Sequence, residues 1–416
     1  MKILVIGSGA REHTIIKALR RDTEEHDILA APGNAGISAD AEIVGLNPAN
    51  PKVVTEFAVT SDVDLVVIGP EAPLVAGVAN ALRKAGVAVF GPDKEAAAIE
   101  GSKSFAKDIM AAAGVPNGKA WTVSTEDELT AALDASGSPY VVKADGLAAG
   151  KGVLVTEDRE AAIEHATFYL QHGDVLVEEF LDGPEVSLFF VSDGQRIVPL
   201  SPAQDYKRAF DGDEGPNTGG MGAYSPLPWL EDGFVESVTT TIAQPVVDEL
   251  AQRGTPFIGL LYCGLIVTED GVKVIEFNAR FGDPETQVVL ARLESPLAPL
   301  LYAAATEMLD SVEPPRFSDQ CALTVVLASE GYPENPVTGR EIVGLDTLPA
   351  DPHVSIAHAA TAWDGSDLLA TGGRVMSVIA TGATFADARQ SAYDTLESIS
   401  LEGSHYRRDI ALRVVS

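Results

Sequence analysis

Short apolar runs alternate with helical patterns over the first hundred residues, and no other feature of the sequence restricts the fold as strongly. The strand-like runs, each closed by a Gly or Pro turn or a Gly-rich loop, are residues 2–6, 27–31, 64–68 and 87–90. Helical patterns at 14–20 and 75–85 follow two of them. Apolar strands that alternate with helices predict an open parallel sheet. Ligands of such sheets bind at the carboxyl ends of the strands, so we expect a binding site at these turns.

The length of the chain predicts more than one domain. It has 416 residues, of which 46% are hydrophobic, and at roughly 100–200 residues per domain two to four domains are expected. The pattern of strand and helix signals changes near Gly101 and again near Asp310. Apolar runs beyond residue 310, at 322–328 and 374–380, predict further strands, and a helix is expected near 385–396.

The formal net charge of -32 argues against nucleic acid and anionic membranes as partners. A local cluster of Lys, Arg and Gly therefore indicates an anionic ligand. The opening apolar stretch is too short for a signal peptide, and no run is long enough to span a bilayer. Cys263 and Cys321 sit in apolar runs and are expected to be buried thiols in a reducing compartment. We expect a cytoplasmic protein, with a monomer as one possible state.

A glycine-rich segment lies between two β runs in the middle of the chain. Residues 140–143 and 153–156 predict a hairpin, and residues 145–152 form its long tip. The spacing differs from a P-loop because the glycines precede a strand. Backbone N–H groups of such a flap can cover a polyphosphate, with Lys143 and Lys151 supplying charge. An ordinary hairpin turn with two solvated lysines is the alternative.

The strand predicted at 272–277 carries two oxygen donors. Glu276 and Asn278 point to one face of a strand, which suits Mg²⁺ carried by a nucleotide. Arg280 follows two residues later, so it would point to the same face, and it could hold a carboxylate or a transferring phosphate. Ile275 and Phe277 would lie on the apolar face. A solvated strand face is the alternative.

The first turn partly matches a dinucleotide fingerprint. Its glycines are Gly7 and Gly9, but Glu12 occupies the third glycine position. Arg11 favours a phosphate ligand smaller than a dinucleotide, and a plain turn is the alternative. A second anion site is predicted where Arg374 follows two glycines and near Arg407 and Arg408, although surface ion pairs would explain these arginines equally well. Residues 201–226 show no strand or helix period and are interpreted as a functional loop.

Taken together, the motifs resemble the phosphoribosylamine–glycine ligase (glycinamide ribonucleotide synthetase) family over essentially the whole chain. The segments that carry the resemblance are 9–13, 31–36, 69–75, 100–103, 143–152, 178–183, 215–224, 276–287 and 406–410. Ala10 stands where many relatives have a second glycine, and 329–333 is less glycine-rich than usual. The resemblance implies an ATP-grasp fold with a Rossmann-like N-terminal domain at 1–101. It further implies an ATP-grasp domain at 102–310, with a mobile lid near 119–182, and a mixed β domain at 311–416. No fused enzyme is expected.

The family pattern also implies site residues. The nucleotide is expected to contact Lys103, Lys143, Gly146, Gly150, Lys151, Gly152, Glu178, Glu179, Phe180, Leu181 and Glu185. Mg²⁺ or Mn²⁺ is expected on Glu276 and Asn278. The phosphorylated sugar is expected at Gly9, Arg11, Asn34, Glu71, Arg374, Arg407 and Arg408. Glycine is expected at Asp205, Pro216, Asn217, Thr218, Gly219, Gly220 and Arg280, with Lys143, Asp205 and Arg280 as the catalytic set.

The resemblance implies a reaction in which ATP phosphorylates glycine and the amine of 5-phosphoribosylamine then attacks the acyl phosphate. Electrostatic stabilisation by cations would dominate, without a covalent nucleophile. Three alternatives remain at this stage. Another ATP-grasp ligase or carboxylase would keep the nucleotide site but not the sugar-phosphate residues. A nicotinamide-dependent oxidoreductase would need the missing third glycine. A nucleotide sensor would bind without turnover.

Overall fold

In the computed structural model, which describes residues 1–146 and 152–415, the first hundred residues form a five-stranded sheet. Its order is β3-β2-β1-β4-β5 and every pairing is parallel, as predicted. The helix expected at 75–85 is divided by Gly77, which has φ +81°. The elements are β1 (Lys2–Gly7), α1 (Ala10–Arg20), β2 (Asp27–Pro32), α2 (Ile37–Asp40), β3 (Glu42–Ile43), α3 (Pro51–Thr60), β4 (Leu65–Ile68), α4 (Glu71–Val75), α5 (Val78–Lys84), β5 (Ala88–Phe90) and α6 (Lys94–Gly101).

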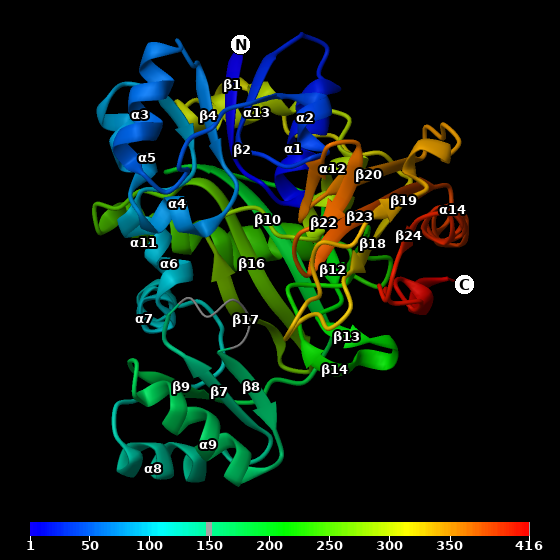
Figure 1. Cartoon of the computed structure of the whole chain (residues 1–416). Coiled ribbons are helices and arrows are strands. Elements are labelled where there is room, and N and C mark those ends of the chain that lie inside the picture. Colours follow the sequence, from blue (N-terminus) through cyan, green and yellow to red (C-terminus); the bar gives the residue numbers. More distant parts are fainter. Residues whose placement is uncertain (147–151, 416) are drawn as a thin grey trace.

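After α7 (Lys103–Ala113), a small lobe hangs below the body of the molecule (Figure 1). Its sheet has the order β6-β9-β7-β8 and packs against α8 and α9 around a core of its own. The predicted hairpin is confirmed, since β7 pairs antiparallel with β8. The lobe consists of β6 (Ala120–Val123), α8 (Glu126–Ser136), β7 (Tyr140–Ala144), β8 (Val153–Thr156), α9 (Arg159–Leu170) and β9 (Val175–Glu178).

A central antiparallel sheet of order β11-β10-β16-β17 lies between the lobe and the N-terminal sheet. Helices α6 and α7 contact β17, and α13 contacts β10 and β16. The elements are β10 (Glu185–Asp193), β11 (Ile197–Pro199), α10 (Phe234–Val238), the π-helical turn η2 (Thr239–Ala243), α11 (Gln244–Gln252), β16 (Ile258–Thr268), β17 (Gly271–Asn278), α12 (Glu285–Arg292), α13 (Leu297–Ala305) and the 3-10 turn η3 (Leu309–Ser311).

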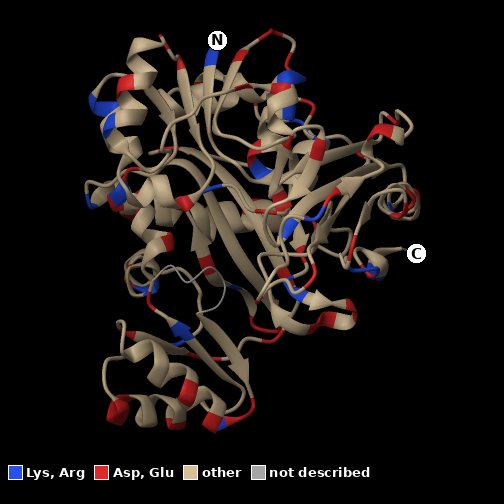
Figure 2. Cartoon of the chain, in the orientation of Figure 1, with Lys and Arg blue, Asp and Glu red and all other residues tan. Residues whose placement is uncertain are grey.

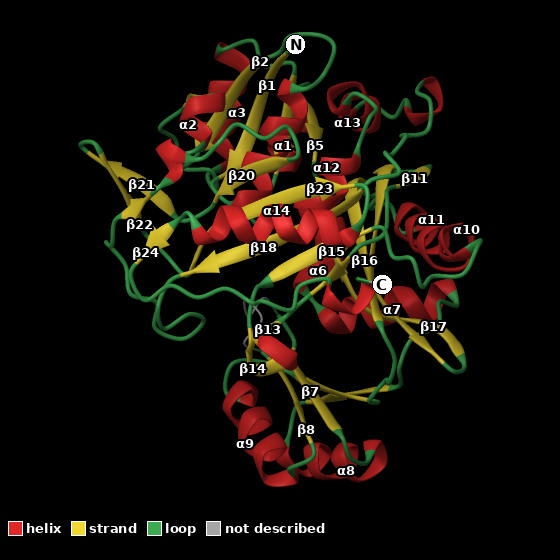
Figure 3. Ribbon diagram, turned by 90° about the vertical axis from the view of Figure 1, so that its right-hand side faces the viewer, coloured by secondary structure: helices red, strands yellow, loops and turns green. Residues whose placement is uncertain are grey.

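A second five-stranded sheet, of order β12-β15-β18-β23-β20, joins the middle of the chain to its C-terminal part. It is packed between α12 and α14, and Figure 3 shows α14 crossing its outer face. The elements are β15 (Gly222–Ser225), β18 (Cys321–Ala328), β19 (Ile342–Val343), η4 (Leu345–Thr347), β20 (Val354–His358), β21 (Thr361–Asp364), β22 (Asp367–Ala370), β23 (Arg374–Gly382), α14 (Phe385–Glu397), β24 (Ser400–Leu401) and η5 (Leu412–Val414).

Residues 201–226 correct the prediction of a stretch without strands. They contain β12 (Gln204–Asp205), β13 (Arg208–Phe210), the turn η1 (Asp211–Asp213), β14 (Glu214–Asn217) and β15. Each strand has only two to four residues, which is too short to show a period of two. Of the two thiols, Cys263 is buried as expected but Cys321 is only partly buried.

Acidic residues are spread over the whole molecule, including the outer helices of the small lobe (Figure 2). The large negative charge is therefore not confined to one acidic patch. In the part of the chain that the structure describes, no helix has the length and apolarity needed to cross a membrane.

Candidate active site

Lysines converge where the small lobe meets the central sheet. Lys143, at the end of β7, places its Nζ 2.7 Å from Oε2 of Glu178 and donates to the carbonyl of Ile275 at 3.3 Å. Lys107 approaches the other oxygen of Glu178 at 3.4 Å. Burial lowers the pKa of Lys107. Because a buried and a partly buried ammonium group share one carboxylate, the cluster carries spare positive charge and suits a polyphosphate.

Lys103 adds a third ammonium group beside the glycine-rich segment. Its Nζ donates to the carbonyl of Gly146 at 3.1 Å, while Asp145 accepts from the backbone N–H of Lys103 at 2.6 Å and from the hydroxyl of Ser104. The carboxylate of Asp145 thus caps the start of α7 and fixes the near end of the segment. Gly152 closes the far end by accepting from Ala144 N–H. Gly150 and Lys151 lie outside the described residues.

A bulge places the two expected metal ligands. Gly264 pairs with Glu276 but Leu265 pairs with Val274, so β17 has one extra residue, Ile275, at this point. The buried residues of β17 are therefore Val274 and Phe277, and the expectation that Ile275 shares the buried face is wrong. The side chains of Glu276 and Asn278 remain partly exposed, which leaves their oxygen donors accessible.

The electrostatics of Glu276 fit a cation-rich phosphate site. Burial raises its pKa, but Lys207, Lys143 and Lys103 outweigh burial and hold the pKa of this carboxyl below its ordinary value. It is therefore an anion at neutral pH. Glu276 and Asn278 offer hard oxygen donors that fit Mg²⁺ or Mn²⁺ when nucleotide phosphates complete the coordination. Among the described residues no group of three or more His, Cys, Asp or Glu is arranged to hold a metal by itself.

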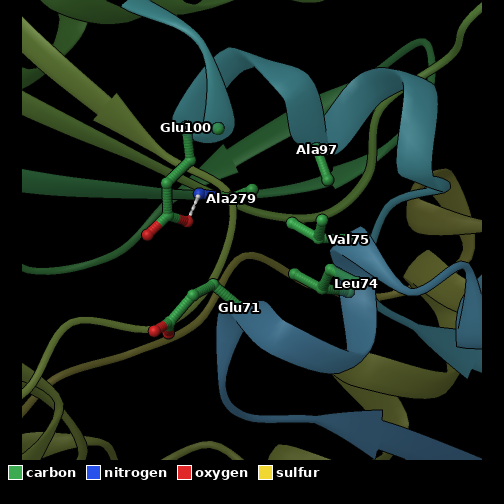
Figure 4. Close-up of a pocket in the computed structure, with 7 residues that line it drawn as sticks. Glu71, Leu74, Val75, Ala97, Glu100 and Ala279 are labelled. Carbon is green, nitrogen blue, oxygen red and sulfur yellow. Dashed lines mark hydrogen bonds between the residues drawn. The ribbon is translucent and has the colours of Figure 1, made fainter. Parts of the chain in front are cut away.

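Arg280 connects the central sheet to the N-terminal part. Its guanidinium lies 2.7 Å from Oε1 of Glu100 and 3.8 Å from Oε2 of Glu71. Glu100 also accepts from the backbone N–H of Ala279 at 2.7 Å. Figure 4 shows the side chains of Glu71 and Glu100 extending on the same side of a small pocket, whose apolar flank includes Leu74, Val75 and Ala97. The arginine is thus held at the junction of three chain segments.

Asp205 and Lys207 form a second charged group near Glu276. Lys207 pairs with Glu185 at 2.6 Å. Burial raises the pKa of Asp205 and Lys207 lowers it; with the contributions of Glu285 and Glu185, which also raise it, the pKa lies at about 7. Burial alone would lower the pKa of Lys207, but Asp205 and Glu185 raise it well above its usual value. Asp205 is therefore poised to exchange a proton near neutral pH.

The segment expected to meet adenine runs from Glu178 to Leu181. The side chain of Glu178 is occupied by lysines, and Glu179 is tied by backbone and side-chain hydrogen bonds to Lys119. Phe180 exposes 40% of its surface. An exposed aromatic ring beside ordered backbone is compatible with stacking on a base.

Glu12 organises the first turn. Its carboxylate accepts from the N–H of Gly9 at 2.6 Å and from Nε of Arg11 at 2.5 Å. A Cβ on Gly7 or Gly69 would lie within 2.6 Å of the Glu12 side chain. The sequence identified Glu12 only as a missing glycine, whereas the structure shows that it packs against neighbouring glycines and orients Arg11.

The remaining residues expected to bind substrate differ in their contacts with this part of the molecule. Asn34 donates to the carbonyls of Ser8 and His358, which joins the first turn to β20. Arg374 donates to the carbonyls of Gly219 and Asp283 at 2.6 and 2.8 Å and brings the loop 216–220 to the same region. Arg408 stacks on Tyr406. Arg407 is fully buried and engaged by Asp213 and Asp409, so a phosphate would have to compete with two carboxylates for it.

A cluster of lysines between a small lobe and a central antiparallel sheet fits an ATP-grasp enzyme, and residues 101–286 match the ATP-grasp (A) domain of phosphoribosylglycinamide synthetase. Residues 1–100 match the N domain and residues 322–413 the C domain of the same enzyme. The chain belongs to the phosphoribosylglycinamide synthetase family. The fold class expected from the sequence is thereby confirmed.

Known proteins resemble the chain along its whole length. It is 65% identical to the phosphoribosylamine–glycine ligase of Leifsonia xyli subsp. xyli, over 99% of this chain and 100% of that protein. The corresponding ligase of Streptomyces coelicolor is 57% identical over 99% of each chain. The crystal structure of phosphoribosylamine–glycine ligase from Thermotoga maritima has a TM-score of 0.85 and 33% identity, over 99% of this chain and 100% of that one. A biotin carboxylase domain from Hydrogenobacter thermophilus, solved with MgADP, shares the fold alone, with a TM-score of 0.72 and 16% identity.

Proposed function

We propose that this chain ligates glycine to 5-phosphoribosylamine with ATP, giving glycinamide ribonucleotide, ADP and phosphate in purine synthesis. The observation that carries the proposal is the cluster of Lys103, Lys143 and Glu276 in a chain that belongs to this enzyme family throughout its length. A carboxylate does not acylate an amine directly because its oxygen is a poor leaving group. Transfer of the terminal phosphoryl group of ATP to glycine gives glycyl phosphate, which the amine can attack.

The proposed nucleotide site lies between β7, β9 and β17. Lys103, Lys143 and Lys151, with the glycines of 146–152, would hold the phosphates, and residues 178–181 would hold adenine. Glu185 is proposed to hold the ribose hydroxyls. Its carboxylate pairs with Lys207 at 2.6 Å, so the hydroxyls would compete with this lysine for the carboxylate. Glu276 and Asn278 would hold Mg²⁺ or Mn²⁺, which neutralises phosphate charge when bound.

The proposed acceptor site lies where the N-terminal turns meet β20 and β23. The sugar phosphate would contact Gly9, Arg11, Asn34, Glu71, Arg374 and Arg408. Glycine would lie near Arg280, Asp205 and the loop 216–220. Arg280 would bind its carboxylate, and Asp205 would accept the proton that the attacking amine loses.

The small lobe is proposed as the lid that excludes water from the acyl phosphate, which water would otherwise hydrolyse. The proposed domain limits are 1–101, 102–310 and 311–416, with the lid near 119–182. The lobe has its own core, including Val142 and Val177, so it can move as a unit. Small molecules are the proposed partners of this enzyme, and the cytoplasm is its proposed location.

The test is ADP release by the purified protein with Mg²⁺-ATP, glycine and phosphoribosylamine generated in situ, each omitted in turn. We expect release to require both glycine and the amine, and glycinamide ribonucleotide to form in equal amount. ADP release that is independent of both, or binding of ATP without turnover, would overturn the proposal. Release with a different carboxylate or amine would instead support another ATP-grasp ligase.

A further inference from the structure

The inference concerns Tyr206, which stands in the sequence between Asp205, a residue of the proposed glycine site, and Lys207. Asp205 and Lys207 interact electrostatically with each other and with Glu276. Successive side chains of an extended segment point to opposite sides. Tyr206 accordingly faces away from the charged group and is 2% exposed. Whatever holds the ring of Tyr206 therefore also fixes the backbone that presents Asp205 and Lys207.

The ring of Tyr206 is held by the C-terminal segment of the chain. The guanidinium carbons of Arg407 and Arg413 lie over it, 4.8 and 5.0 Å from its centroid. Its hydroxyl oxygen accepts from the backbone N–H of Ala411 at 2.9 Å. Two cation–π contacts and a hydrogen bond on one side chain restrict its position more than packing alone would.

Arg407 is committed to this internal arrangement. Nε and a terminal nitrogen donate to the two oxygens of Asp409 at 2.8 and 2.6 Å, and the other terminal nitrogen donates to Asp213 at 2.8 Å and to the carbonyl of Arg208 at 3.1 Å. Four of the five N–H groups of a guanidinium are thus engaged. Breaking such buried pairs is costly, which favours a structural over a ligand-binding role.

The same segment holds the hairpin that follows Lys207. Asp211 accepts from the N–H of Arg408 at 2.7 Å, and Asp409 accepts from the N–H of Gly212 at 2.9 Å. At the base of the hairpin, both the N–H and the hydroxyl of Thr218 donate to the carbonyl of Lys207 at 2.8 Å. The hairpin therefore connects the C-terminal segment to the loop 216–220.

We propose that residues 405–413 form a brace that sets the positions of Asp205 and Lys207 through Tyr206, and that Tyr206, Arg407 and Arg413 are positioning residues for glycine. The inference rests on the proposed function for the identity of the substrate. Displacement of a catalytic group by about 1 Å can lower a rate about a hundredfold. The brace is therefore expected to affect glycine use far more than ATP binding, since Lys143 and Glu178 lie on other elements.

Two mild variants test the brace. Tyr206→Phe removes the hydroxyl that meets Ala411, and Arg413→Met removes the more exposed of the two cations, whose side chain is 47% exposed. We expect each variant to raise KM for glycine and to lower kcat, so that kcat/KM for glycine falls about tenfold. KM for ATP should stay within twofold of the parent. Arg413→Lys should restore most of the loss. Arg340→Met, which removes an ion pair with Glu330 elsewhere in the C-terminal part, is the matched control and should match the parent.

Amide hydrogen exchange gives a readout that does not depend on turnover. The N–H groups of Tyr206 and Thr218 donate to the carbonyls of Gly222 and Lys207, and their exchange should accelerate in Arg413→Met but not in Arg340→Met. Unchanged glycine kinetics, or unchanged exchange at these amides, would overturn the brace. If the parent protein lacks glycine-dependent ADP release, the proposed function fails, and the exchange result still decides whether the brace exists.

Discussion

Lys143 and Glu178 form a buried ion pair of 2.7 Å within the small lobe, and the same ammonium group donates to the carbonyl of Ile275 on β17. One side chain thus ties both β7 and β9 to the strand that carries Glu276. In the proposed reaction this lysine would meet the phosphates of ATP. Lys107, whose ammonium lies 3.4 Å from the other oxygen of Glu178, would then help to neutralise this carboxylate.

Replacing Lys143 by Met should abolish most ATP turnover without unfolding the protein. Loss of one positioned electrostatic group typically costs about a hundredfold to a thousandfold in kcat, and Lys107 remains 3.4 Å from Glu178 to limit the loss of stability. Glycine-dependent ADP release and thermal unfolding are the measurements. Lys119→Met, which removes an exposed lysine of the same lobe, is the control. Turnover within fivefold of the parent would contradict the role of Lys143.

Glu276→Gln should weaken the use of divalent metal. The substitution keeps an oxygen donor but removes the negative charge that three lysines stabilise. We expect about a hundredfold lower kcat at ordinary Mg²⁺ and partial recovery at high Mg²⁺ or Mn²⁺, measured by titrating metal at fixed ATP. Glu269→Gln changes an exposed carboxylate in the turn of the same hairpin and should leave the titration unchanged. An unaltered metal requirement in Glu276→Gln would exclude it as a ligand.

Local patterns were sufficient where the chemistry is carried by neighbouring residues. The parallel sheet, the hairpin that contains Lys143, and the pairing of Glu276 with Asn278 on one strand follow from short-range periodicity. The family motifs then named the chemistry. These features were predictable because alternation and glycine-rich turns leave their signal within a few residues of each other.

Contacts between residues far apart in the sequence determine the features that local patterns did not predict. Lys107 sits in an ordinary helical pattern, and only folding brings it to Glu178. The charge of Arg407 suggested a phosphate ligand, but the fold buries this arginine and pairs it with Asp213, which is far away in the sequence. Ile275 was assigned to the apolar face because strict alternation along the strand places it there. The bulge that breaks this alternation leaves no signal in the sequence.

Asp205→Asn should change how stability depends on pH. The folded protein raises the pKa of Asp205 from 3.8 to about 7, so between these values the folded state binds a proton that the unfolded chain has released. Its contribution to stability is fully present below about pH 4 and is lost as the pH rises through 7. The free energy of unfolding of the parent, minus that of the variant, should therefore fall across this window in denaturant titrations. Asp270→Asn, in an exposed turn, should give a constant difference, and a constant difference for Asp205→Asn would refute the raised pKa.

Gly36→Ala should destabilise the contact between the N-terminal sheet and β20. A Cβ at this position would lie 2.4 Å from Cγ of His358 and 2.6 Å from Cε1 of His13. Neither ring can move aside freely, since His13 binds Asp40 at 2.9 Å and the Nδ1 of His358 lies 3.1 Å from the hydroxyl of Thr361. Overpacking of this kind costs about 1–3 kcal/mol, measurable by denaturant unfolding.

The matched control for this substitution is Gly45→Ala. No atom lies within 4 Å of a Cβ built at Gly45, so this variant should unfold like the parent. Because Asn34 and Gly36 belong to the same turn, Gly36→Ala should also raise KM for phosphoribosylamine more than KM for ATP. Equal stability of the two glycine variants would mean that the histidine pair can move aside, and it would contradict the predicted overpacking at Gly36.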